Sequence, residues 1–263
     1  MRGVEVELRK RLPGFELDVG WAVGDGVAVL FGHSGVGKSL TLSLIAGLTR
    51  PDAGHVRIAG ETLFDAQARV DVPTHRRGLG YVSQSLALFP HMSLRQNVAY
   101  GLRRLSAEER QSRVGEVAEA LHVAELLDRR PHEVSGGQRQ RVAIARALAP
   151  RPRALLLDEP FSALDLPLRR EMRGVVREAH ERFGIPVLLV THDPYEAFEM
   201  ADTMVVYGAD GVVQYGRPDD LYDDPGTPAI RRLLHSADHP IAAPTPAIRI
   251  RRSPPLQREG VRA

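Results

Sequence analysis

The sequence predicts an α/β fold with a parallel-sheet core, an antiparallel β subdomain at its amino end and an inserted helical subdomain. Three patterns predict this arrangement. Short continuous apolar runs, typical of buried parallel strands, occur at 27–31, 154–157 and 186–190. Polar and apolar residues alternate at 4–9 and 15–19, as they do in antiparallel strands. From about residue 88 to 150 the apolar spacing is that of helices.

The composition is that of an ordinary globular protein. Hydrophobic residues make up 43% and charged residues 26%, and the net charge is +2 because arginines are scattered among nearly as many acids. That pattern does not favour a nucleic-acid surface. The absence of cysteine excludes disulfides and cysteine-bound zinc. Since the sequence has neither a signal peptide's apolar stretch nor a membrane-spanning run, we expect a cytoplasmic protein.

The first half of the chain supplies a strand and a helix that flank a glycine-rich loop. The apolar strand Val27–Phe31 runs into this loop, and Lys38–Leu48 follows as a helix. Another short strand is expected at His55–Ile58, followed by a polar stretch at Glu61–Arg77.

Two helices of the insertion are marked by their first residues. Ser106 and Glu109 form an S-x-x-E capping box. Four apolar residues then fall on one helix face: Val114, Val117, Ala118 and Leu121. A second capped helix begins at Ser135, and Pro150 stops it.

The last part returns to alternating strands and helices. A helix is expected at Pro167–Phe183, with Gly184 as its C-cap. A hairpin follows, with strands at Met204–Tyr207 and Val212–Tyr215 and with Asp210-Gly211 at its turn. We interpret residues 1–235 as one domain. The stretch 236–263 is rich in Pro, Ala and Arg, and we expect it to be a disordered tail.

The glycine-rich loop matches the P-loop pattern G-x-x-x-x-G-K-[ST], so the core is predicted to be a P-loop NTPase core. Its lysine, Lys38, is one of only two lysines in the chain. A compact ammonium reaches the β- and γ-phosphates, whereas the arginine fork is bulkier and differently shaped. The residues expected to bind nucleotide are Gly32, His33, Ser34, Gly35, Val36, Gly37, Lys38, Ser39 and Leu40.

Two carboxylates, Asp158 and Glu159, follow the buried strand at 154–157. This is the end of the strand at which open α/β sheets hold their ligands. We expect Asp158 to hold Mg²⁺ together with the hydroxyl of Ser39, and Glu159 to orient or deprotonate an attacking water. An acidic helix-cap turn is the structural alternative.

The segment Ser135-Gly136-Gly137-Gln138 opens a predicted helix. Free backbone N–H groups and the positive end of the helix dipole make such a start an anion site, and an ordinary serine-capped helix is the alternative. Gln84 lies where the core gives way to the insertion, and His192 follows the strand at 186–190. Taken singly, either residue is more typical of a polar surface position.

In order, the motifs are the P-loop, Gln84, Ser-Gly-Gly-Gln, Asp-Glu, Ser162-Ala163-Leu164-Asp165 and His192. This order resembles the ATP-binding subunit of ABC transporters, over residues from about 4 to 235. In that family two such domains pair head to tail and enclose two ATP molecules. The resemblance therefore implies an ATPase that acts as a homodimer, with ATP and Mg²⁺ at the interface.

The resemblance also implies roles for individual residues. Gly35, Gly37 and Lys38 would cradle the phosphates. The Mg²⁺ site would use Ser39, Gln84 and Asp158. The catalytic set would comprise Glu159 as base, His192 at the γ-phosphate, Gln84 and Lys38. The partner copy would close each site with Ser135, Gly136, Gly137, Gln138 and Asp165. The family usually stacks adenine on an aromatic residue; Leu12 falls about where it is expected, and Phe15 lies nearby.

A subunit without fused membrane helices resembles the importer arrangement. This implies two separate permease subunits, which would contact this chain around Leu88–Gly101. It further implies an extracytoplasmic solute-binding protein, which would interact with this chain only indirectly. It also implies a peripheral position on the cytoplasmic face of the membrane, with no nucleic acid bound. The alternative class is a non-transport ABC ATPase that acts on nucleic acid or the ribosome. A small-molecule kinase would leave Ser135–Gln138 and His192 without a role.

For the solute, one stretch of the chain resembles the molybdate and tungstate importers. The residues concerned are Leu63-Phe64-Asp65, Pro73, Arg76-Arg77, Gly80-Tyr81-Val82, Leu88-Phe89-Pro90-His91, Asn97 and Tyr100-Gly101. Sulfate and iron importers share parts of this pattern and remain alternatives. Molybdate subunits usually add a carboxy-terminal regulatory domain, and the roughly 28 residues after His235 are too few for one.

Overall fold

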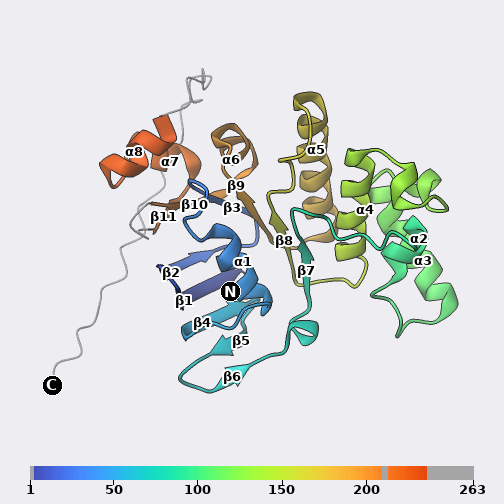
Figure 1. Cartoon of the computed structure of the whole chain (residues 1–263), viewed down its shortest axis with the longest axis horizontal. Helices are drawn as coiled ribbons and strands as arrows, with labels where there is room; N and C mark the ends of the chain where they lie inside the picture. The colour runs from blue at the N-terminus through green and yellow to red at the C-terminus, as the bar shows by residue number, and fades with distance from the viewer. Residues whose placement is uncertain (1–2, 209–212, 236–263) are drawn as a thin grey trace.

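Two β-sheets form the centre of the protein in a computed structural model that describes residues 3–208 and 213–235 (Figure 1). Within these residues, the larger sheet has six strands in the order β11-β10-β3-β9-β8-β7. They are β3 (Val27–Phe31), β7 (Leu79–Val82), β8 (Ala154–Asp158), β9 (Val187–Thr191), β10 (Thr203–Tyr207) and β11 (Val213–Gly216). Only β10 and β11 pair antiparallel among them. The predicted parallel core is confirmed.

The smaller sheet is antiparallel, in the order β2-β1-β4-β5-β6. Its strands are β1 (Val4–Leu12), β2 (Phe15–Val23), β4 (Ala53–Ile58), β5 (Glu61–Asp65) and β6 (Val70–Asp71). The sheet therefore continues into the stretch at 61–77, for which the sequence pattern predicts only polar character. The alternation signal is absent there because β5 buries two adjacent residues, Leu63 and Phe64, next to a shift in the β4–β5 register.

Helices cover both faces of the larger sheet. They are α1 (Lys38–Ala46), α2 (Leu94–Ala99), α3 (Ala107–Ala120), α4 (Gly136–Leu148), α5 (Leu166–Phe183), α6 (Pro194–Met200), α7 (Pro218–Asp223) and α8 (Pro228–His235). Short 3₁₀ turns occur at Thr74–Arg76, Ala124–Leu126 and Pro131–Glu133. Successive residues of β3 enter different hydrophobic clusters: one contains residues of α1, and the other contains residues of α3 to α6. The continuous apolar runs of the sequence reflect this burial on two sides.

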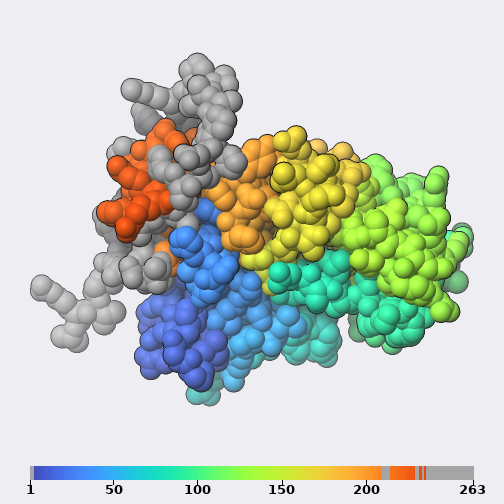
Figure 2. Space-filling model, turned by 45° about the horizontal axis from the view of Figure 1, so that its top comes forward, coloured from blue at the N-terminus to red at the C-terminus, as the bar shows by residue number. Residues whose placement is uncertain are grey.

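The predicted helical subdomain is present as α2, α3 and α4. In Figure 2 its residues, drawn in green, form the end of the molecule away from the blue antiparallel strands. Both predicted starts are confirmed, because Ser106 and Ser135 cap their helices in reciprocal capping boxes. Within the described residues, no helix combines the length and apolar character needed to cross a bilayer.

Other predicted boundaries shift by a few residues. Helix α1 ends two residues earlier than expected because Gly47 adopts a left-handed φ of 74° and caps it. Helix α5 ends as predicted, at Gly184 with φ 60°. The hairpin strands β10 and β11 pair, while the predicted Asp210-Gly211 turn and the tail at 236–263 lie outside the described residues.

A buried arginine, Arg77, joins the core to the antiparallel sheet. Its guanidinium donates to the carbonyl oxygens of Leu44 and Ile45 at 3.0 and 2.8 Å, and to that of Val72 at 2.8 Å. It also pairs with Asp71 at 3.2 Å. The guanidinium therefore satisfies carbonyls at the end of α1, where the helix dipole favours a cation.

We expect Arg77→Met to lower the free energy of unfolding by about 3 kcal/mol, because several buried carbonyls lose their donor. Urea denaturation measures this loss. Arg76→Met is the matched control, since Arg76 is exposed. Equal losses in the two variants would show that the Arg77 contacts do not stabilise the fold.

Candidate functional site

The predicted site residues meet at one edge of the larger sheet. Parallel strands end at the same edge, and β3, β9, β8 and β7 follow one another in the sheet in that order. The P-loop follows β3, Gln84 follows β7, Glu159 follows β8 and His192 follows β9. Sheet order therefore gathers residues that are far apart in the sequence.

The P-loop requires glycine at its turns. Gly35 and Gly37 have φ values of 86° and 100°, which other residues rarely adopt. A Cβ on Gly37 would lie 2.6 Å from the side chain of Leu17 and 3.1 Å from the ring of Phe15. The loop is thus packed closely against β2.

Lys38 lies almost wholly buried inside this loop. Its Nζ donates to the carbonyl oxygens of Gly32 and His33, both at 2.7 Å. Burial lowers the pKa of Lys38, and the nearby carboxylates of Glu159 and Asp158 oppose that shift. The loop therefore holds a partly desolvated ammonium near two carboxylates.

Asp158 is held between two hydroxyl groups. Ser39 Oγ donates to one carboxylate oxygen at 2.6 Å, and Tyr81 Oη donates to the other at 3.3 Å. Burial, and secondarily Asp158, raises the pKa of Tyr81 to about 12. The phenol thus remains a hydrogen-bond donor at neutral pH.

These donors suit magnesium. Ser39 and Asp158 present two adjacent oxygen ligands, and the side-chain oxygen of Gln84 is a further candidate. Mg²⁺ prefers oxygen and is usually bound by one or two carboxylates together with substrate phosphates and water. Within residues 3–208 and 213–235, no group of three or more acidic, histidine or cysteine side chains could hold a metal by itself. The set therefore fits a metal that arrives with a phosphate.

Glu159 has an unusual backbone conformation for a non-glycine residue, with φ 47°. Its N–H donates to the carbonyl of Val190 at 3.1 Å, and its own carbonyl accepts from Ser162 Oγ at 3.0 Å. Its carboxylate is 3.2 Å from His192 Nδ1 and accepts from Gln84 Nε2 at 3.5 Å. Three predicted catalytic side chains therefore lie in contact.

Ser135 lies elsewhere, at the start of α4. In Figure 1, α4 and α1 are on opposite sides of α5. Ser135 is exposed, and its hydroxyl accepts only from the Gln138 N–H among the described hydrogen bonds. A Cβ on Gly137 would lie 2.7 Å from Leu168 of α5, which begins after Asp165. The start of α4 is thus packed against the first turns of α5, away from the P-loop of the same chain.

The sequence patterns assign no chemical role to Tyr81 or Ser162, although both lie in stretches that carry the family resemblance. Tyr81 fixes Asp158, and Ser162 fixes both Glu159 and the Gln84 amide, which donates to its Oγ at 3.4 Å. A buried hydrogen-bond chain also runs from the P-loop helix to β2. It passes from Gly37 O through Thr41 and Tyr207 Oη to Trp21 Nε1. Pattern rules could not find these residues because each acts through a tertiary contact.

Leu12 and Phe15, the two positions considered for an adenine contact, differ in where they lie. The ring of Phe15 lies against the P-loop at Gly37, whereas Leu12 is 42% exposed at the end of β1. Phe15 is therefore better placed to meet a base bound at this loop.

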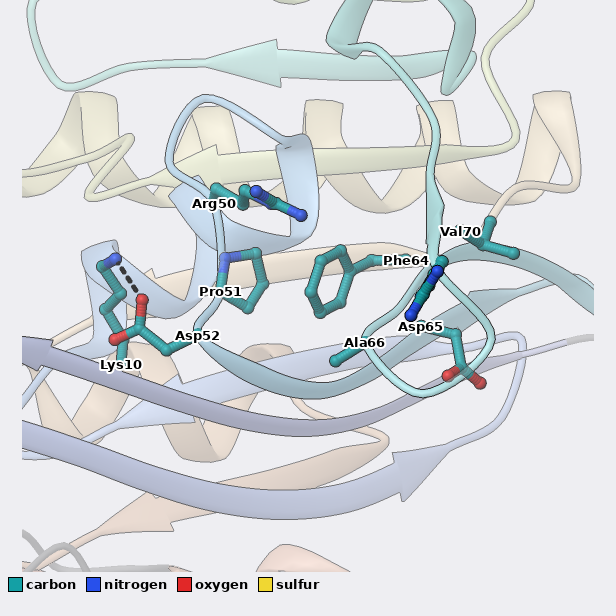
Figure 3. A pocket seen from close by; sticks show the side chains of 9 residues that line it. Lys10, Arg50, Pro51, Asp52, Phe64, Asp65, Ala66 and Val70 are labelled. Carbon is teal, nitrogen blue, oxygen red and sulfur yellow. Dashed lines mark hydrogen bonds and ion pairs between the residues drawn. The ribbon is translucent and has the colours of Figure 1, made fainter.

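A cavity of about 560 Å³ lies outside the site (Figure 3). Its lining includes Lys10 and Arg50. Lys10 pairs with Asp52 at 2.7 Å, and Arg50 pairs with Asp71 at 3.1 Å. The ring of Phe64 faces Pro51 across the cavity. No P-loop residue lines it. We therefore do not assign it to phosphate chemistry.

Comparisons with known proteins show similarity in sequence and in fold. A family model described as "ABC transporter" matches residues 21–162. The molybdate/tungstate import ATP-binding protein WtpC of Archaeoglobus fulgidus is 45% identical, over 83% of this chain and 89% of that protein. The molybdenum import ATP-binding protein ModC of Paramagnetospirillum magneticum is 42% identical over 85% of this chain. The chain spans 61% of the length of that ModC.

Two further similarities bear on solute and fold. The sulfate/thiosulfate import ATP-binding protein CysA of Synechococcus elongatus is 42% identical, over 88% of this chain and 67% of that protein. The solved structure of cbiO1 from Clostridium perfringens, part of the ABC transporter complex cbiONQ, superposes with a TM-score of 0.74. It is 26% identical and covers 84% of this chain and 90% of its own.

We expect Tyr81→Phe to raise the Mg²⁺ concentration needed for half-maximal ATP binding by about fivefold, because Asp158 loses one of its two orienting donors. Titration calorimetry at fixed ATP measures this. Tyr215→Phe, on the opposite edge strand β11, is the control. An unchanged Mg²⁺ requirement would show that the phenol does not position Asp158.

Proposed function

Because the chain belongs to the ABC transporter family, we propose that it is the ATP-hydrolysing subunit of an importer. One observation carries the proposal above all others. The Ser39–Asp158 contact at 2.6 Å and the Glu159–His192 contact at 3.2 Å lie together at the mouth of the P-loop. That arrangement supplies a phosphate cradle, oxygen ligands for a metal and a base for water.

Each group has a part in hydrolysis. The P-loop N–H groups and Lys38 bind the phosphates of ATP, and Phe15 lies where a base bound at the loop would meet it. Ser39, Asp158 and Gln84 would hold Mg²⁺, which neutralises charge on the transferring phosphoryl group. Glu159 accepts the proton of the attacking water, and His192 contacts the γ-phosphate. Hydrogen bonds from the Glu159 N–H to Val190 and from Ser162 Oγ to the Glu159 carbonyl hold the backbone of Glu159. They would keep its carboxylate directed at the attacking water.

A second copy of the chain completes the site. The start of α4 with Ser135 and the start of α5 with Asp165 are neighbours, and both residues are exposed. Leu166, the residue after Asp165, is 73% exposed and would be covered by the partner copy. In a head-to-tail homodimer this surface would place Ser135 and its helix start on the γ-phosphate in the other copy's P-loop. Loss of that phosphate on hydrolysis then loosens the dimer.

The helical subdomain offers a place for the permease subunits. A hollow of about 450 Å³ lies between α2 and α3, and its lining includes Ala99, Ala107, Arg110 and Val114. The exposed ring of Tyr100 lies next to it. An apolar floor with basic groups suits a short helix at the cytoplasmic face of a membrane protein. The chain would thus be peripheral to the membrane, through two permease subunits, with an extracytoplasmic solute-binding protein acting indirectly.

For the solute we propose molybdate or tungstate. This rests on kinship with ModC and WtpC, because an ATPase subunit does not touch the transported ion. Sulfate is the second candidate, since CysA is similarly close. All three are tetrahedral oxyanions.

We expect Glu159→Gln to bind ATP normally and to hydrolyse it at least about 100-fold more slowly, because an amide cannot accept the proton from water. The variant should accumulate as a dimer with ATP and Mg²⁺ bound, which gel filtration measures. A monomer that still turns over ATP would contradict the assignment of Glu159 as base.

Uptake by cells that lack the gene tests the solute. Wild-type protein should restore molybdate uptake, tungstate should compete, and an equal concentration of sulfate should not. Cells that carry Glu159→Gln are the control. Restored sulfate uptake with no effect on molybdate would replace the proposed solute and leave the ATPase assignment intact.

A further inference from the structure

Arg146 links the helix that begins at Ser135 to the loop that carries Gln84. It lies in the last turn of α4, and both ends of its guanidinium donate to the backbone. Nη1 donates to the carbonyl of Ala87 at 2.7 Å, and Nη2 donates to the carbonyl of Leu86 at 2.8 Å. The ring of Phe89 lies 5.3 Å from the guanidinium carbon. Burial lowers the pKa of Arg146, so this cation is partly desolvated in order to make these bonds.

The two carbonyls belong to a strained step of the chain. Leu86 and Ala87 are consecutive non-glycine residues with φ values of 60° and 46°. A single left-handed residue of this kind is uncommon, and it persists only where its surroundings hold it. Local bonds from Leu86 N to Ser83 O and from Ala87 N to Ser85 O close the turn from one side. Arg146 holds it from the other.

Gln84 depends on this turn for its position. Its amide reaches Glu159 and Ser162 only through long hydrogen bonds, at 3.5 and 3.4 Å. Contacts of the side chain alone therefore fix it weakly. The backbone at 83–87, with Arg146 on its carbonyls, sets where the amide lies.

We propose that Arg146 is a positioning residue that sets Gln84 in the catalytic site and couples it to the Ser135 end of α4. The inference rests on the proposed ATPase function. It adds a physical connection between Ser135, at the start of α4, and Gln84 in the catalytic site. Because α4 carries both Ser135 and Arg146, a movement of this helix on meeting the partner's ATP shifts the carbonyls of Leu86 and Ala87. Lysine can replace the guanidinium only in part, since one ammonium lacks its two parallel N–H directions.

The test removes the Arg146 guanidinium in one variant and, in a second, also relieves the backbone strain at Ala87. We expect Arg146→Met to lower kcat for ATP hydrolysis by about tenfold and to raise the Mg²⁺ requirement, because Gln84 is misplaced. The dissociation constant for ATP without Mg²⁺ should stay unchanged, since the P-loop is intact. Arg146→Lys should fall between the wild type and Arg146→Met.

A second substitution separates positioning from folding. Glycine adopts the left-handed conformation without strain, so Ala87→Gly in the Arg146→Met background should restore kcat by about threefold or more. Ala68→Gly, in an exposed turn, is the matched control and should restore nothing. Melting temperatures of all variants show whether each one is folded.

The outcomes are distinct. Wild-type protein that neither binds nor hydrolyses ATP would overturn the proposed function itself. An active wild type with a folded Arg146→Met variant at full kcat would overturn the positioning role alone. Lost activity that Ala87→Gly does not restore would also overturn it, because Arg146 would then act through packing rather than through the turn.

Discussion

The common edge of four parallel strands is the constraint on which the site depends. Chain segments separated by more than a hundred residues meet there because β3, β9, β8 and β7 succeed one another in the sheet. Each segment adds one chemical group immediately after its strand ends. The strands are buried on both faces, so their ends cannot shift independently. Rigid strands thus allow loops with unusual conformations, such as those of Gly37 and Glu159, to remain in place.

Arginines that donate to backbone carbonyls provide a second layer of support. Arg77 and Arg146 bind carbonyl oxygens at the end of α1 and in the turn after Gln84, and Arg113 donates to the carbonyls of Leu148 and Ala149 at the end of α4. A planar fork suits this task because it can serve two acceptors at once. The one buried lysine, Lys38, lies instead in the P-loop, where we propose that phosphate binds.

Local signals made much of the fold predictable. Ser106 and Ser135 mark their helices through contacts with residues three positions away, and Gly184 marks the end of α5. The candidate site residues were likewise found from motifs at strand ends, and the structure brings most of them together. Two features lay beyond such rules. Strand β5 has no alternating pattern, and Tyr81 acquires its role only because β7 pairs with β8 and so lies beside Asp158.

The buried hydrogen-bond chain from Gly37 to Trp21 has a practical consequence. Trp21 is the only tryptophan in the sequence, and it is shielded from solvent. Its indole N–H ends a relay of hydroxyl groups that begins at the carbonyl of Gly37. A movement of the P-loop would therefore change the polarity around the single indole. The unlabelled protein would then carry its own fluorescent reporter of nucleotide at the P-loop, with no second tryptophan to obscure the signal.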